Sequence, residues 1–126
     1  MTTLTPYVVI GGEPAILNLV ERFYFYMDTL PEVKPLRDIH QPDLSPAKSK
    51  LFKYISGWLG GPNLFIEEFG HPMLRARHLP FSIGEQERDQ WMLCMNMAIA
   101  EMTMDPTLRT NLLNALQDLS THMINR

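Results

Sequence analysis

The segment from Gly70 to Phe81 carries a histidine, His78, in a setting that could bind a cofactor. Pro72 can open a helix at its first position, where the missing N–H of proline is not needed, and Pro80 prevents the helix from continuing. The sequence therefore predicts a helix of about two turns, with His78 near its end.

Two arginines, Arg75 and Arg77, stand shortly before this histidine. Arg75 and Arg77 stand on other faces of the short helix and can reach toward carboxylates. An iron porphyrin needs a neutral imidazole for its metal and positive partners for its propionates, so a ring nitrogen beside cations suits it. A single histidine before a proline also occurs where it merely ends a helix, and this segment alone does not decide between the two roles.

The composition predicts one soluble, cytoplasmic domain over residues 1–126. A formal net charge of −3, without any run of basic residues, argues against nucleic-acid binding. Cys94 is the only cysteine, which excludes an internal disulfide and fits a reducing compartment, and its apolar neighbours predict an inert core thiol. The sequence shows neither a secretion signal nor the roughly 20 consecutive apolar residues of a membrane span.

Apolar periodicity predicts an all-α chain with long helices. The expected helices run from Pro14 to about Asp28, from a Ser45 N-cap to the Gly60-Gly61-Pro62 turn, from a Ser82/Glu85 capping box through Met102, and from an Asp105 N-cap through Met123.

The segments between these helices are expected to be short or irregular. A short turn should run through residues 33–39, and residues 63–69 should form a loop with at most one helical turn. Residues 7–10 look strand-like, but a strand without a partner cannot form a sheet.

Polar aromatic side chains on separate elements could face His78. Tyr24 lies on the apolar face of the first long helix, Trp91 on that of the third, and His40 follows the first helix. For any one of them, packing in the core is the commoner role. Together they supply the hydrogen-bond donors that a haem distal pocket needs to hold a polar diatomic ligand.

Other kinds of site are less well supported. His71 and His78 are seven positions apart, but Pro72 separates them and no third ligand completes a zinc site. Neighbouring acidic residues are usually solvated, so we expect a surface position for Glu67, Glu68, Glu85 and Glu87.

Over essentially its whole length the chain resembles the group II truncated haemoglobins. The resemblance rests on Gly11-Gly12 before the first long helix, Phe23-Tyr24 within it, Gly60-Gly61-Pro62, His71-Pro72, the run from Leu74 to Phe81, and Trp91.

The resemblance implies an all-α fold, the two-over-two helical sandwich that encloses haem b (iron protoporphyrin IX). It implies that His78 is the proximal iron ligand and that Tyr24, His40 and Trp91 lie on the distal side. It also implies haem contacts by Lys50, Leu51, Ile55, Leu74, Arg77, Phe81 and Met95, with Arg77 and Lys50 near the propionates.

His40 stands where members of this group often have tyrosine or phenylalanine. A histidine there keeps a distal donor and adds a group that titrates near neutral pH. If its ring contacts the ligand, ligand affinity would depend on pH. The iron could also be coordinated on both sides by protein side chains.

The implied function is reversible binding of oxygen and other small ligands (CO, NO), with oxygen storage or transport as one role. Turnover of nitric oxide, peroxides or peroxynitrite with an unknown reductase is another, so the sequence leaves open whether the protein is an enzyme. One alternative is a cofactor-free helical interaction domain, which would be colourless. Another is a non-haem metal protein that uses both His71 and His78.

Overall fold

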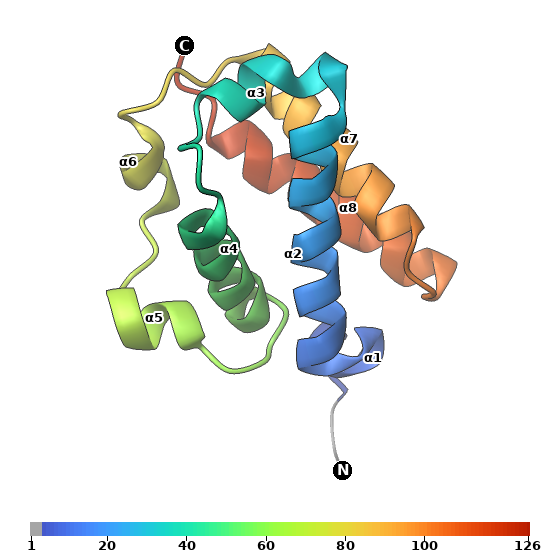
Figure 1. Ribbon diagram of the computed structural model, residues 1–126. Helices are drawn as coiled ribbons and strands as arrows, with labels where there is room; N and C mark the ends of the chain where they lie inside the picture. The colour runs from blue at the N-terminus through green and yellow to red at the C-terminus, as the bar shows by residue number, and fades with distance from the viewer. Residues whose placement is uncertain (1–3) are drawn as a thin grey trace.

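The computed structural model describes residues 4–126, and all regular elements in that range are helices (Figure 1). The α-helices are α1 (Pro6–Ile10), α2 (Gly12–Thr29), α3 (Lys34–Asp38), α4 (Ser45–Trp58), α5 (Leu64–Phe69), α6 (Leu74–His78), α7 (Glu85–Ala100) and α8 (Pro106–His122), with a 3₁₀ helix η1 (Pro31–Val33) before α3.

The long helices form two pairs, α2 with α4 and α7 with α8, and α2 packs across α7. Figure 1 shows α2 and α4 running in opposite directions, with α7 and α8 crossing obliquely beside them. This arrangement is the two-over-two helical sandwich that the sequence resemblance implied. None of the helices in residues 4–126 is both long and apolar enough to cross a bilayer.

The apolar face of α2 forms the centre of the core. Its buried residues recur three or four positions apart, as the periodicity predicted, and they are Ile16, Leu19, Val20, Phe23, Tyr24 and Met27. Gly11 lets α2 start directly after α1, because its φ of 115° is a left-handed conformation that glycine adopts without strain. The first long helix is thereby anchored at its start and along its buried face.

Two short segments are more helical than predicted. Residues 7–10 belong to α1, whose first turn is capped by the Thr5 hydroxyl accepting from Val8 N–H at 3.3 Å. Residues 63–69 contain α5, which is longer than one turn because Phe65 packs edge-on against Tyr54 and tertiary contact stabilises it.

Three predicted starts of long helices are wrong by one or two residues, and a fourth is confirmed. Helix α2 begins at Gly12 rather than at Pro14. Ser45 is the first residue of α4 rather than its N-cap, and its N–H donates to Asp43 at 3.0 Å. Helix α7 begins at Glu85, and the capping contact joins Gly84 N–H to the Glu87 carboxylate at 3.1 Å rather than Ser82 to Glu85. The Asp105 carboxylate caps α8 as predicted.

Replacing Ile16 with alanine should lower the free energy of unfolding by about 2–5 kcal/mol, because the side chain is fully buried and a cavity would remain. Leu17→Ala, one position along at an exposed site, should change it by less than about 0.5 kcal/mol. Urea unfolding of the two variants at equal haem content tests this. Equal losses of unfolding free energy in the two variants would contradict the burial of this face of α2 in the core.

Candidate functional site

A cavity of about 670 Å³ lies among α2, α4, α6 and α7. Its lining is mostly apolar, but it includes the residues that the sequence analysis singled out for chemistry: Tyr24 from α2, His40 after α3, His78 from α6 and Trp91 from α7. The fold therefore brings these side chains, which come from separate elements, to one cavity.

His78 is the last residue of α6, and its ring is fixed by its own helix. Nδ1 lies 2.6 Å from the carbonyl oxygen of Leu74. Because a carbonyl can only accept, the neutral ring carries its proton on Nδ1 and keeps a lone pair on Nε2. This is the protonation state in which an imidazole binds a metal.

Helix α6 starts later and is shorter than predicted. It begins at Leu74 after Met73, whose φ of 43° is left-handed, so Pro72 precedes the helix instead of opening it. Arg77 anchors this segment: Nε donates to the carbonyl of Pro72 at 2.6 Å, and Nη2 lies within 3.3 Å of the carbonyls of Phe69 and His71. These bonds replace the helical turn that the sequence predicted.

Arg77 and Lys50, which the resemblance placed near propionates, both line the cavity. Nε and Nη2 of Arg77 are occupied by backbone carbonyls, which leaves Nη1 for an anionic group. The ammonium of Lys50 lies 5.7 Å from the ring of Phe69. Both cations are at the cavity, and their contact with propionates stays a prediction.

Tyr24 lines the cavity, and its hydroxyl is accessible from it. The residue is 5% exposed, and within residues 4–126 no protein group hydrogen-bonds its hydroxyl. Burial raises the pKa of Tyr24, so the hydroxyl stays protonated and can donate. The ring of Phe23 contacts both Tyr24 and Trp91, with ring centroids 4.9 Å and 5.3 Å away, so one core side chain holds both in place.

His40 faces the same space in a protonation state that the sequence analysis did not foresee. Its Nδ1 lies 3.0 Å from the carbonyl of Leu36, and its ring is edge-on to Tyr24. Burial lowers the pKa of His40, assisted by the charges of Arg37 and His78, and outweighs the opposing bond to Leu36. The neutral ring therefore offers Nε2 to the cavity as an acceptor, and the expected role of His40 beside a bound ligand stays a prediction.

The remaining predicted contacts divide into lining and core residues. Leu51, Leu74 and Phe81 line the cavity as expected. Ile55 and Met95 do not line the cavity. Both are buried in the core cluster, at 3% and 0% exposure, because the side of α4 that carries Ile55 and the side of α7 that carries Met95 pack on α2. Their expected haem contact stays a prediction.

One wall of the cavity was missed by the sequence analysis. It comes from the C-terminal half and includes Ile83, Glu87, Leu119, Ser120 and Met123. Glu87 was expected at the surface but is 4% exposed, with one carboxylate oxygen bonded to Gly84 N–H and, at 2.5 Å, to Arg126. A glutamate three positions after a glycine at a helix start is a capping signal that could have indicated this position.

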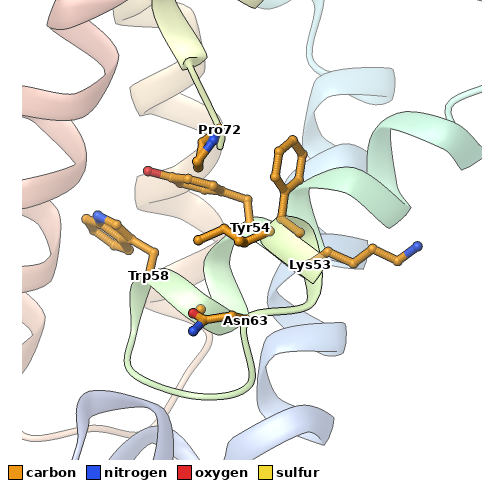
Figure 2. Close-up of a pocket in the computed structure, with 8 residues that line it drawn as sticks. Lys53, Tyr54, Trp58, Asn63 and Pro72 are labelled. Carbon is orange, nitrogen blue, oxygen red and sulfur yellow. The ribbon is translucent and has the colours of Figure 1, made fainter. Parts of the chain in front are cut away.

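A second, smaller cavity of about 210 Å³ adjoins the first (Figure 2). Figure 2 shows Tyr54, Trp58, Asn63 and Pro72 around it. Tyr54 and Phe65 line both cavities, and their rings meet edge-on with centroids 6.1 Å apart, so this pair forms the partition. The smaller cavity has no histidine in its lining.

Comparison with known proteins identifies the family. The family described as bacterial-like globin matches residues 5–125. The group 2 truncated hemoglobin YjbI of Bacillus subtilis (strain 168) is 39% identical over 121 residues, which cover 96% of this chain and 89% of that protein. This chain belongs to the group II truncated haemoglobins.

Solved truncated haemoglobins have the same fold. The cold-adapted truncated haemoglobin of the Antarctic marine bacterium Pseudoalteromonas haloplanktis TAC125 is 46% identical, with a TM-score of 0.95, covering 98% of this chain and 99% of that chain. The group II 2-on-2 haemoglobin of Agrobacterium tumefaciens is 43% identical, with a TM-score of 0.95, covering 99% and 97%. The predicted two-over-two fold of a haem-binding globin is confirmed.

The residues of this truncated haemoglobin fit a haem. The cavity provides an imidazole at His78 whose Nε2 is free, a mostly apolar lining, cations at Arg77 and Lys50, and a tyrosine hydroxyl at Tyr24. No protein group in residues 4–126 hydrogen-bonds this hydroxyl, so it is free to donate to a polar ligand in this space.

The His40 ring should titrate below the ordinary histidine value of 6.5, because burial disfavours its charged form. NMR titration of histidine ring protons in the diamagnetic carbon monoxide form tests this, with His40→Gln to assign the signal. Since the folded chain then binds fewer protons than the unfolded chain, His40 lowers stability as the pH falls through 6.5. A midpoint at or above 6.5 would contradict the burial argument.

Proposed function

We propose that this truncated haemoglobin holds haem b through Nε2 of His78 and reversibly binds oxygen and other small diatomic ligands, carbon monoxide and nitric oxide, beside Tyr24 and Trp91. The observation that carries the proposal is that one cavity joins a histidine with a free Nε2 to the hydroxyl of Tyr24, which no protein group in residues 4–126 hydrogen-bonds. When bound, haem supplies an iron centre that binds diatomic gases and can exchange electrons.

Tyr24 is the principal hydrogen-bond donor of the distal side. Its raised pKa keeps the proton on the hydroxyl, and its largely apolar surroundings leave few protein groups to compete for the bond. A hydrogen bond in such a low-dielectric space is stronger than in water. Tyr24 therefore favours ligands that carry partial negative charge, as oxygen does on ferrous iron.

Trp91 and His40 also belong to the proposed distal side, and they differ in hydrogen bonding. The indole of Trp91 can only donate, so it adds to the stabilisation of a polar ligand. The neutral ring of His40 can only accept at Nε2, so it contributes a donor to the ligand only when protonated at low pH. Donation at neutral pH thus rests on Tyr24 and Trp91.

Slow release of the ligand favours reaction over transport. Buried donors hold a polar ligand tightly, and a tightly held ligand is a poor cargo for delivery. A relative from Bacillus subtilis that is 38% identical, with a TM-score of 0.87, is described as oxygen-avid. We therefore extend the proposal to turnover of nitric oxide, peroxides or peroxynitrite, with an electron donor supplied by a reductase, rather than to oxygen transport.

The net charge and the cysteine content bear on the partners and the cellular location of the protein. The net charge of −3 disfavours nucleic acid as a partner. The single cysteine is buried, and burial raises the pKa of its thiol to about 11, so it is suited to a reducing compartment and stays unreactive. We propose a cytoplasmic location.

His78→Ala should abolish or strongly weaken the Soret band of the purified protein, because it removes the only proposed iron ligand. His71→Ala is the matched control: His71 is exposed and lies outside the cavity lining, so its loss should leave the spectrum unchanged. A protein that is colourless and takes up no added haemin would support the helical interaction domain instead. Equal sensitivity to both substitutions would support a metal site that uses both histidines.

Tyr24→Phe should raise the oxygen dissociation rate about tenfold, because it removes one buried hydrogen bond of roughly 1–1.5 kcal/mol without changing the ring. Tyr26→Phe is the control on the same helix, since the Tyr26 hydroxyl bonds Glu101 on the far side from the cavity lining. Stopped-flow displacement of oxygen measures both rates. An unchanged rate in Tyr24→Phe would remove Tyr24 from the proposed mechanism.

A further inference from the structure

The C-terminal residues that follow α8 pack against the segment that leaves His78. Asn125 N–H donates to the carbonyl of Ile83 at 2.8 Å, and Ile83 N–H donates to Oδ1 of Asn125 at 3.0 Å. This reciprocal pair fixes the end of the chain beside the loop between α6 and α7.

The side-chain amide of Asn125 also reaches the backbone of His78 itself. Nδ2 lies 3.2 Å from the carbonyl oxygen of His78 and 2.8 Å from that of Phe81. An amide nitrogen has two hydrogens to donate, so both donors of Asn125 are used, while Oδ1 accepts from Ile83. One half-buried side chain therefore holds both the end of α6 and the turn after it.

Two arginines extend this contact between the tail and the His78 segment. Nη1 of Arg75, in α6, donates to the carbonyls of His122 and Ile124 at 2.8 Å and 2.7 Å. Arg126 pairs with the buried carboxylate of Glu87 at 2.5 Å, close to the start of α7. We call the bonds of Asn125, Arg75 and Arg126 the C-terminal clamp.

Helix α6 needs such external contacts because it cannot hold its own conformation. It has only five residues, no side-chain N-cap, and a left-handed residue, Met73, before it. Helices this short are not stable without tertiary contacts. Arg77 fixes the segment before the helix through the carbonyls of residues 69–72, and Asn125 fixes the end at which His78 stands.

We propose that Asn125 is a positioning residue for His78. By holding the carbonyl of His78, its amide sets where the imidazole stands and the direction in which Nε2 faces the cavity. The inference rests on the proposed function, since it takes His78 as the iron ligand. It assigns to the C-terminal tail, distant in sequence, part of the control over the bond between protein and iron.

The first test is hydrogen–deuterium exchange of the purified protein. Asn125→Asp keeps the oxygen that accepts from Ile83 but replaces the donor to His78 and Phe81 with a carboxylate oxygen. Amides of residues 74–84 should then exchange about tenfold faster, the change expected when a hydrogen bond or two is lost, while α2 stays unchanged. Asn114→Asp, the same chemical change at an exposed position of α8, is the matched control.

The second test reads the iron–histidine bond directly. In the ferrous, ligand-free protein, the resonance Raman band of this bond should shift and broaden in Asn125→Asp and in the uncharged variant Asn125→Ala, but not in Asn114→Asp. A purely structural role would lower stability without moving the band. Spectra of all variants are taken at equal haem content.

The outcomes separate the inference from the proposed function. Unchanged exchange of residues 74–84 in both Asn125 variants would overturn the clamp. Faster exchange with an unmoved band would overturn the positioning role. If the wild-type protein shows no iron–histidine band at all, the proposed function fails and the positioning role fails with it, while the exchange data still decide whether Asn125 holds the segment.

Discussion

The short helix that carries His78 is held in place from outside, and much of the site depends on this constraint. Five residues cannot form a stable helix alone, so the position of His78 is set by hydrogen bonds from Arg77, Arg75 and Asn125 to backbone carbonyls. The distal side is built differently. Tyr24 and Trp91 stand on long helices whose packing, through Phe23, fixes both rings. One side of the cavity is therefore positioned by polar bonds and the other by core packing.

The same local hydrogen bond determines which ring nitrogen carries the proton in both histidines of the cavity. Each ring bonds through Nδ1 to the carbonyl four residues earlier, Leu74 for His78 and Leu36 for His40. The bond places the proton on Nδ1 of the neutral ring and leaves the Nε2 lone pair free. For His78 this is the state suited to the iron ligation that we propose. For His40 it makes Nε2 an acceptor at neutral pH, so the proposed donation to a polar ligand rests on Tyr24 and Trp91.

The helices predicted from the sequence were accurate where the residues of one helix are enough to determine its structure. The periodicity of α2, α4, α7 and α8 follows from an apolar face repeated over several turns, and Asp105 caps α8 as its residue type predicts. It was less accurate where tertiary contacts decide. Residues 7–10 and 63–69 are helical because they pack on other segments, and Met73 displaces the start of α6.

The site shows the same division. His78, Tyr24, His40 and Trp91 line one cavity, as expected from their types and from the resemblance. Ile55 and Met95 lie in the core cluster and outside the cavity lining. A periodic stripe does not say which of two neighbouring faces meets the core and which meets a cavity. The contacts of Asn125 with His78 and Phe81, and of Glu87 with Arg126, join residues about forty positions apart, so no local pattern could indicate them.

Glu87 connects the two sides of the site. Its carboxylate is buried, caps the start of α7 through Gly84, and pairs with Arg126, whose side chain is half exposed. A buried charge that loses its partner is costly, so the start of α7 and the C-terminal tail are energetically coupled. Because α7 carries Trp91 and the tail bonds the His78 segment, this ion pair connects the helix of Trp91 to the segment of His78 through the loop between α6 and α7. Substitutions in the tail should therefore act on the cavity itself, whereas substitutions in the core act first on stability.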